Sequence, residues 1–196
     1  VSHFDISGND INDEQLLKKL AVALSANPRG TTRALAEAAG ISRATFNRFC
    51  GSRENLMEMI GKQAETAIQE IIHLAQEKVE DYEAALLGLI EVHLKNQEYL
   101  IFVCGTQSSL ENIYWENYLE GLDRFFLNGQ KAGKFRLEFS NQMLTELFVS
   151  TICGMIDAER RSRVAASGIE KKMAAFFLNG VANIFADAKL SPRRCR

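Results

Sequence analysis

The sequence has few prolines and no closely spaced cysteines. Only Pro28 and Pro192 occur in 196 residues, and the interval between them is rich in Leu, Ala, Glu and Lys, which favour helix. The four cysteines are far apart and form no Cys-x-x-Cys pair, which argues against a disulfide framework and against a zinc knuckle. We therefore predict an all-α protein in a reducing, cytoplasmic compartment.

Long apolar runs and catalytic motifs are also missing. No apolar stretch approaches the roughly 20 residues needed to span a bilayer, and the first ten residues lack the basic and apolar regions of a signal peptide. The three histidines, His3, His73 and His93, form no metal-ligand set, and no nucleophile elbow or glycine-rich phosphate loop occurs. We expect no membrane partner, no metal, no cofactor and no catalytic residue, and hence no enzyme.

Charge is unevenly distributed along the chain, although the formal net charge is only −2. Residues 28–53 contain five arginines and one acidic residue, a local excess of four positive charges that leaves −6 for the remainder. A basic module joined to an acidic body is typical of a DNA-binding head on a regulatory domain. An ordinary solvated run of charge is the alternative, and charge alone does not decide between the two.

Two short helices are predicted to meet across a tight glycine turn. Hydroxyl side chains at Thr31 and Ser42 are suited to cap the two helices, and Gly40 and Gly51, which can take a left-handed conformation, end them. Apolar periodicity predicts the other helices over residues 13–26, 53–77, 82–103, 111–131, 141–163 and 169–188. The helix over 53–77 is long enough to connect an N-terminal head to a larger helical body.

The segment from Thr31 to Leu56, TTRALAEAAGISRATFNRFCGSRENL, resembles the DNA-binding region of the TetR family of repressors. The match includes the Thr-Thr opening, the Gly-Ile-Ser turn, the Arg-Ala-Thr start of the third helix and the Gly-Ser-Arg-Glu-Asn-Leu start of the connector. The order ATFNRFCGSRENL and residues 157–161 further resemble a branch that represses multidrug-efflux genes. The resemblance implies a three-helix helix-turn-helix domain over 1–54, a helical ligand-binding and dimerisation domain over 55–190, and a disordered tail over 191–196.

Candidate DNA contacts lie at the starts of three helices. Residues near the N-terminus of a helix in the major groove reach the base edges, so we assign Arg43 to a guanine and Ala44 to a thymine methyl. Asn47 replaces a tyrosine that commonly grips phosphate in the family, and it suits either adenine or phosphate. For the hydroxyl residues, helix capping alone is the alternative. The full predicted set is Thr31, Thr32, Arg33, Ser42, Arg43, Ala44, Thr45, Asn47, Arg48, Ser52 and Arg53. Of these, Thr31, Thr32, Arg33, Ser52 and Arg53 are expected on phosphate.

The resemblance also implies a homodimer and an effector pocket. One reading helix gives little specificity, so helix-turn-helix proteins commonly pair on two half-sites. For the dimer interface we select, from the last two helices, Leu144, Leu147, Phe148, Met155, Phe177, Val181 and Ile184. For the pocket we select Tyr99, Phe102, Trp115, Tyr118 and Phe126. Packing in the internal core is the alternative for every member of both sets.

These features predict a ligand-responsive transcriptional regulator. The expected activity is repression: a homodimer binds a palindromic operator in double-stranded DNA and is released by a small apolar or amphipathic effector. Control of an efflux gene is a further expectation from the resemblance. The alternative is a helical ligand-binding or partner-binding protein without operator specificity, which Asn47 permits. An activator role stays open because operator position decides the sign of regulation.

Overall fold

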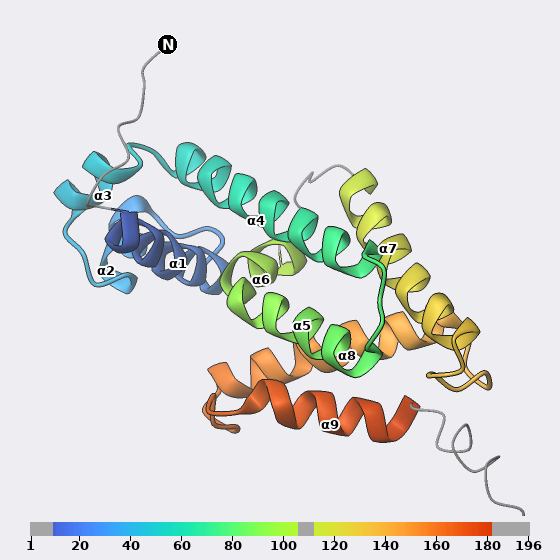
Figure 1. The fold of residues 1–196 in the computed structure, drawn as a ribbon. Helices are drawn as coiled ribbons and strands as arrows, with labels where there is room; N and C mark the ends of the chain where they lie inside the picture. The colour runs from blue at the N-terminus through green and yellow to red at the C-terminus, as the bar shows by residue number, and fades with distance from the viewer. Residues whose placement is uncertain (1–9, 106–111, 182–196) are drawn as a thin grey trace, which may run out of the picture. The chain divides into compact units, whose positions relative to one another are not determined.

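In the computed structural model, which describes residues 10–105 and 112–181, the regular secondary structure of those residues is helical and includes no strand (Figure 1). The predicted all-α class is confirmed. The helices are α1 (Asp10–Ala26), α2 (Thr32–Ala38), α3 (Arg43–Phe49), α4 (Arg53–Gln76), α5 (Tyr82–Lys95), α6 (Gln97–Gly105), α7 (Asn112–Lys131), α8 (Asn141–Arg160) and α9 (Ile169–Val181). None of these described helices combines the length and the apolar character that a bilayer crossing requires.

The described residues form two compact units. The first comprises the described part of residues 1–67 and 96–111, and the second that of residues 68–95 and 112–196. Helix α4 begins in the first unit and ends in the second. The domain boundary predicted between residues 54 and 55 falls within the first turn of this shared helix.

The first unit is built on a continuous apolar core. Leu20 of α1, Leu35 of α2, Phe46 of α3 and Leu56 of α4 are all fully buried in one cluster. Helix α6 packs against α1 and adds Tyr99 to the same cluster. Because α2 and α3 have only seven residues each, they are too short to be stable alone, and this shared core holds them in place.

The second unit has an aromatic core. Rings of Tyr82, Phe125, Phe126 and Phe135 contact one another with centroid separations of 5.3 to 5.8 Å. Helix α8 packs against α7, and α9 packs against α5. The turn between α7 and α8 is held by Gln130, whose Nε2 donates to two backbone carbonyl oxygens at 2.8 and 2.7 Å. This unit therefore has a core of its own.

The helix predicted over 82–103 is wrong as a single element. The structure divides it at Asn96 into α5 and α6, and the Asn96 carbonyl accepts the backbone N–H groups of Tyr99 and Leu100, both at 3.1 Å. The asparagine side chain can hydrogen-bond nearby backbone groups in non-helical conformations, so asparagine is disfavoured inside helices and favoured at their starts. This preference explains the break inside a continuous apolar pattern. The predicted tail over 191–196 and the end of the helix predicted over 169–188 lie outside the described residues.

Replacement of Gly129 by alanine is expected to destabilise the second unit. A Cβ atom at Gly129 of α7 would overlap the buried Phe135 ring, so Gly129→Ala should lower the free energy of unfolding by about 1–3 kcal/mol. Denaturant titration measures this change. Gly61→Ala on α4 is the matched control: a Cβ there meets no atom within 4 Å, so helix propensity should raise stability by about 0.5–1 kcal/mol. Equal effects of the two changes would contradict the packing argument.

Candidate nucleic-acid interface

Side-chain caps mark the starts of α2 and α3, and a glycine lies in the turn between the two helices. Thr31 Oγ1 accepts the Ala34 N–H at 3.2 Å, and Ser42 Oγ accepts the Thr45 N–H at 3.0 Å. Gly40 takes the left-handed conformation at φ 72°, which glycine adopts without steric cost. The predicted caps at Thr31 and Ser42 and the predicted glycine turn are confirmed, so the helix-turn-helix geometry follows from local sequence signals.

Helix α3 has one buried side and one exposed side. Phe46 is 0% exposed and Cys50, at the helix end, is also buried, so both anchor α3 in the first unit. Arg43, Ala44, Asn47 and Arg48 are exposed, and Thr45 is half-buried, with its hydroxyl 2.9 Å from that of Ser42. The exposed side is free of packing requirements and carries two guanidinium groups.

The residues predicted to bind phosphate differ in their surroundings. Thr31 is exposed and Thr32 half-buried at the start of α2, while Arg33 forms an exposed ion pair with Glu37 at 2.8 Å. The Ser52 hydroxyl caps α4 by accepting the Asn55 N–H at 3.1 Å. Arg53, the last of the residues predicted to bind phosphate, donates to the Pro28 carbonyl and to Met57 Sδ. Local sequence patterns did not predict these contacts.

The five predicted pocket residues divide between the two units. Tyr99 and Phe102 of α6 are buried in the core cluster of the first unit, where the Tyr99 hydroxyl finds no hydrogen-bond partner among the residues that the structure describes. In the second unit, Trp115 stacks on Tyr118 with centroids 5.0 Å apart, and Phe126 is fully buried in the aromatic core. Trp115 is therefore the member of the set whose side chain is open to solvent in the described chain.

A buried histidine beside Tyr118 is the feature that the sequence analysis did not single out. His93 of α5 is 2% exposed, and its Nδ1 lies 2.6 Å from the Leu89 carbonyl oxygen while Nε2 lies 2.8 Å from the Tyr118 hydroxyl. A carbonyl only accepts, so Nδ1 carries the proton and the tyrosine hydroxyl donates to Nε2. Burial lowers the pKa of His93 to about 4, and the ring is neutral at pH 7. The position of His93 four residues after Leu89 on an apolar helix was its available sequence signal.

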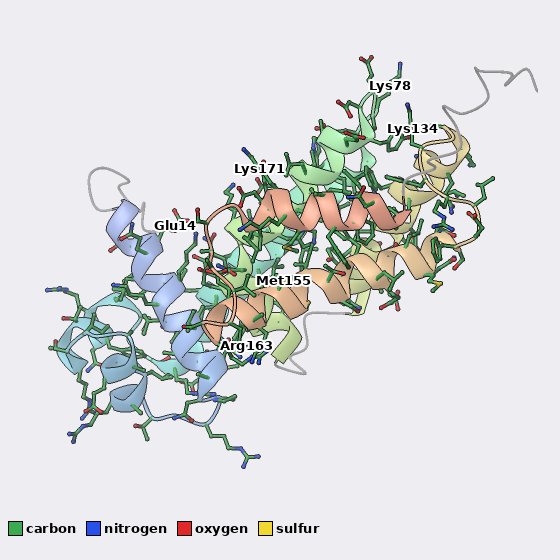
Figure 2. The ribbon with its side chains drawn as sticks, turned by 90° about the horizontal axis from the view of Figure 1, so that it is seen from below. Glu14, Lys78, Lys134, Met155, Arg163 and Lys171 are labelled. Atoms are coloured by element: carbon green, nitrogen blue, oxygen red, sulfur yellow. The ribbon has the colours of Figure 1, made fainter. Side chains whose placement is uncertain are left out.

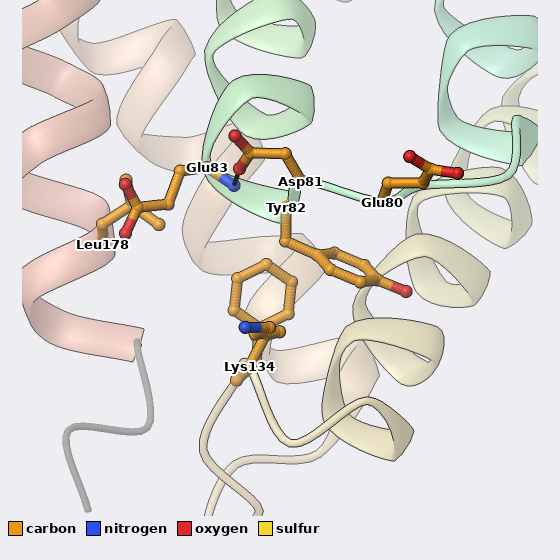
Figure 3. Close-up of a pocket in the computed structure, with 7 residues that line it drawn as sticks. Glu80, Asp81, Tyr82, Glu83, Lys134 and Leu178 are labelled. Atoms are coloured by element: carbon orange, nitrogen blue, oxygen red, sulfur yellow. Dashed lines mark hydrogen bonds between the residues drawn. The ribbon is translucent and has the colours of Figure 1, made fainter. Parts of the chain in front are cut away.

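Two hollows occur on the surface of the second unit. One, of about 370 Å³, is formed by the start of α5, the turn after α7 and Leu178 of α9, and its lining includes Glu80, Tyr82 and Lys134 (Figure 3). The other, of about 440 Å³, lies between α4 and α5 around Leu74 and Gly88. Neither is lined by a predicted pocket residue. Within the described residues, no group of three side chains is arranged to hold a metal ion.

The residues selected for the dimer interface are divided between core and surface. Leu144, Phe148, Phe177 and Val181 are buried within the second unit. Leu147 is 41% exposed, and Met155, labelled on α8 in Figure 2, is half-buried. Ile184 lies outside the described residues. Among residues not in the predicted set, Phe176 of α9 is 72% exposed, so apolar surface remains on both α8 and α9.

Comparison with known proteins agrees with this architecture. The chain is 42% identical to the HTH-type transcriptional regulator NfxB of Pseudomonas aeruginosa, over 88% of this chain and 95% of NfxB. The TetR family regulator PfmR from Thermus thermophilus superposes with a TM-score of 0.57 at 19% identity, covering 88% of this chain and 95% of PfmR. LfrR from Mycobacterium smegmatis, described as TetR-like, gives 0.57 at 18% identity, covering 88% and 98%. No protein-family model matches the chain.

The fold, the helix-turn-helix and the similarity to NfxB define a DNA-binding transcriptional regulator and not an enzyme. The chain belongs to the TetR family of transcriptional regulators. The resemblance found in residues 31–56 is thereby confirmed at the level of the family.

His93 is expected to destabilise the fold as pH falls. Its pKa is about 4 in the folded protein against 6.5 ordinarily, so the unfolded chain takes up the proton first. The free energy of unfolding should therefore drop between pH 6.5 and 4, by up to about 3 kcal/mol at the acid end. Urea titrations at pH 7.5, 6.0 and 5.0 measure the slope, and His93→Gln should flatten it in this window. An unchanged slope in that variant would show that other groups cause the pH dependence.

Proposed function

We propose that this protein is a repressor that binds a palindromic operator as a homodimer and is released by a small apolar or amphipathic effector. The observation that carries the proposal is the exposed side of α3, where Arg43, Ala44, Asn47 and Arg48 are free of the core while Phe46 is fully buried. A helix presented in this way fits the major groove of DNA. Membership of the TetR family supports the regulatory role.

The proposed base contacts follow from side-chain chemistry. Arg43, the first residue of α3, suits a bidentate contact with guanine, and the Ala44 methyl suits a thymine methyl. Asn47, one turn further along, suits adenine or a phosphate oxygen. Thr31 and Thr32, at the start of α2, are proposed to contact the DNA backbone and to fix the register of α3.

The proposed dimer interface uses the apolar side chains that the subunit leaves exposed on α8 and α9. Leu147 of α8 and Phe176 of α9 are the clearest members, and Met155, eight residues after Leu147 on α8, is half-buried. Buried members of the predicted set, such as Phe148, pack in the core of the second unit and hold α8 and α9 in place. Two copies would place two α3 helices on two half-sites, which supplies the specificity that one helix lacks.

The effector is proposed to act on the second unit. LfrR was solved in complex with proflavine, a ligand of that protein, and we extend the apolar or amphipathic ligand class to this chain. Trp115, which is open to solvent and stacks on the buried Tyr118, offers aromatic surface for such a ligand. Helix α4 runs from this unit into the one that holds α3. A ligand that binds better to a state unable to hold DNA shifts the population toward that state. Control of an efflux gene belongs to the same proposal.

Arg43→Ala is expected to relax base preference. Loss of a bidentate guanine contact should reduce discrimination between operator and competitor DNA by about 1–3 kcal/mol. Gel shifts on the intergenic DNA next to the protein's own gene, at near-physiological salt, measure this with wild type, Arg43→Ala and the exposed control Arg163→Ala. Specific retention by wild type and the control, lost in Arg43→Ala, supports the proposal. Absence of specific retention by wild type favours a binding protein without operator specificity.

Leu147→Glu is expected to dissociate the dimer. A carboxylate at this exposed apolar position of α8 would be desolvated against the second copy, which costs several kcal/mol. Sedimentation or light scattering should show the mass falling toward that of one 21.9 kDa chain. Leu137→Glu makes the same change in the turn between α7 and α8, at a residue 74% exposed, and should leave the dimer intact. A dimer that persists in Leu147→Glu would refute this interface.

A further inference from the structure

Arg53 and Pro28 lie at the two ends of the helix-turn-helix segment. Pro28 belongs to the turn that follows α1, Arg53 is the first residue of α4, and residues 29–52 with α2 and α3 lie between them. An Arg53 Nη2 group donates to the Pro28 carbonyl oxygen, a contact that spans 25 residues of sequence. The contact therefore closes the segment that carries the reading helix, and we call it the Arg53–Pro28 clasp.

The Arg53 guanidinium is held on more than one side. Its Nη1 donates to Met57 Sδ at 3.4 Å, one turn along α4. Its Nε is buried and has no hydrogen-bond partner within the described part of the chain. The side chain is half-buried, whereas Arg43 and Arg48 of α3 are exposed. Because Pro28 and Met57 already accept from its Nη groups, this guanidinium is less available to DNA phosphate than the exposed arginines of the same basic segment.

The turn that receives the contact is tight. The Gly30 N–H donates to the Asn27 carbonyl oxygen at 2.9 Å, and a Cβ at Gly30 would lie 2.9 to 3.1 Å from atoms of Asn27. Helix α2 begins two residues later, so the path of this turn sets where α2 starts. Since α2 and α3 have seven residues each, their orientation depends on what holds the ends of the segment as well as on the core.

We propose that Arg53 is a positioning residue of the DNA-binding unit: the Arg53–Pro28 clasp fixes the segment that presents α3, and Arg53 does not itself hold phosphate. This replaces the phosphate role expected from its place at a helix start. The effect on DNA affinity rests on the proposed DNA-binding function. The Arg53–Pro28 clasp itself rests on the geometry of the protein without DNA.

Lysine at position 53 separates the two roles. Arg53→Lys keeps the positive charge, so a phosphate contact would be largely retained. Lysine lacks the planar fork that donates in two directions at once, so the paired contacts with Pro28 and Met57 would be lost. Arg29→Lys makes the same chemical change at an exposed residue next to Pro28 and is the matched control.

The clasp is tested first without DNA, by hydrogen exchange of the full-length protein. Arg53→Lys should accelerate exchange of the Asn27 and Gly30 amides, which are hydrogen-bonded in this turn, at least tenfold, whereas Arg29→Lys should leave them at the wild-type rate. Wild-type exchange in Arg53→Lys would overturn the clasp. Hydrogen exchange does not depend on the identity of the DNA, so it tests the clasp even if the wild type does not bind the chosen duplex. Failure of the wild type to bind that duplex would count against the proposed function and not against the clasp.

The positioning role is tested by DNA affinity as a function of salt, on the intergenic DNA next to the protein's own gene. Arg53→Lys and Arg53→Gln should each weaken binding at least fivefold with the slope of log K against log salt unchanged. A slope that falls by about 0.9 per protomer in Arg53→Gln, with wild-type affinity in Arg53→Lys, would assign Arg53 to phosphate. A lower melting temperature with unchanged affinity of the folded protein would reduce Arg53 to a purely structural residue, and it too would overturn the proposal.

Discussion

The burial of Phe46 is the constraint on which the reading surface depends. Helix α3 has seven residues, too few to persist in water by local hydrogen bonds, and its one fully buried large side chain fixes it to the core of the first unit. Because Phe46 faces inward, helical geometry turns Arg43, Ala44 and Asn47 toward solvent. The same interaction that stabilises the helix therefore determines which residues face solvent, and these are the residues proposed to contact DNA.

The core of the second unit contains buried polar groups as well as aromatic rings. His93 and Tyr118 satisfy each other and the Leu89 carbonyl, which removes most of the cost of burying them. Thr145 has a buried hydroxyl with no hydrogen-bond partner among the described residues, and burying such a group costs free energy.

The parts of the fold that were predictable are those encoded by neighbouring residues. Thr31, Ser42 and Gly40 mark helix ends by their own side-chain and backbone chemistry, and the structure has those ends. Asn96 was missed because apolar periodicity continues across it. The contacts His93–Tyr118 and Arg53–Pro28 each join residues 25 apart, and tertiary packing, which no local pattern records, decides such pairs. Exposure of Leu147 beside buried Phe148 likewise required the packed structure.

The exposed side of α3 has a consequence for how such regulators diverge. The side chains on this side are exposed and lie outside the core: Arg43, Ala44, Asn47 and Arg48. The buried Phe46 and Cys50 hold the helix against the first unit. Surface substitutions away from packing and caps usually change stability by less than about 0.5 kcal/mol. Descendants of one gene can therefore exchange these four residues while every copy still folds. If α3 contacts DNA as proposed, substitutions on the surface of one short helix are enough to change the operator that a descendant binds.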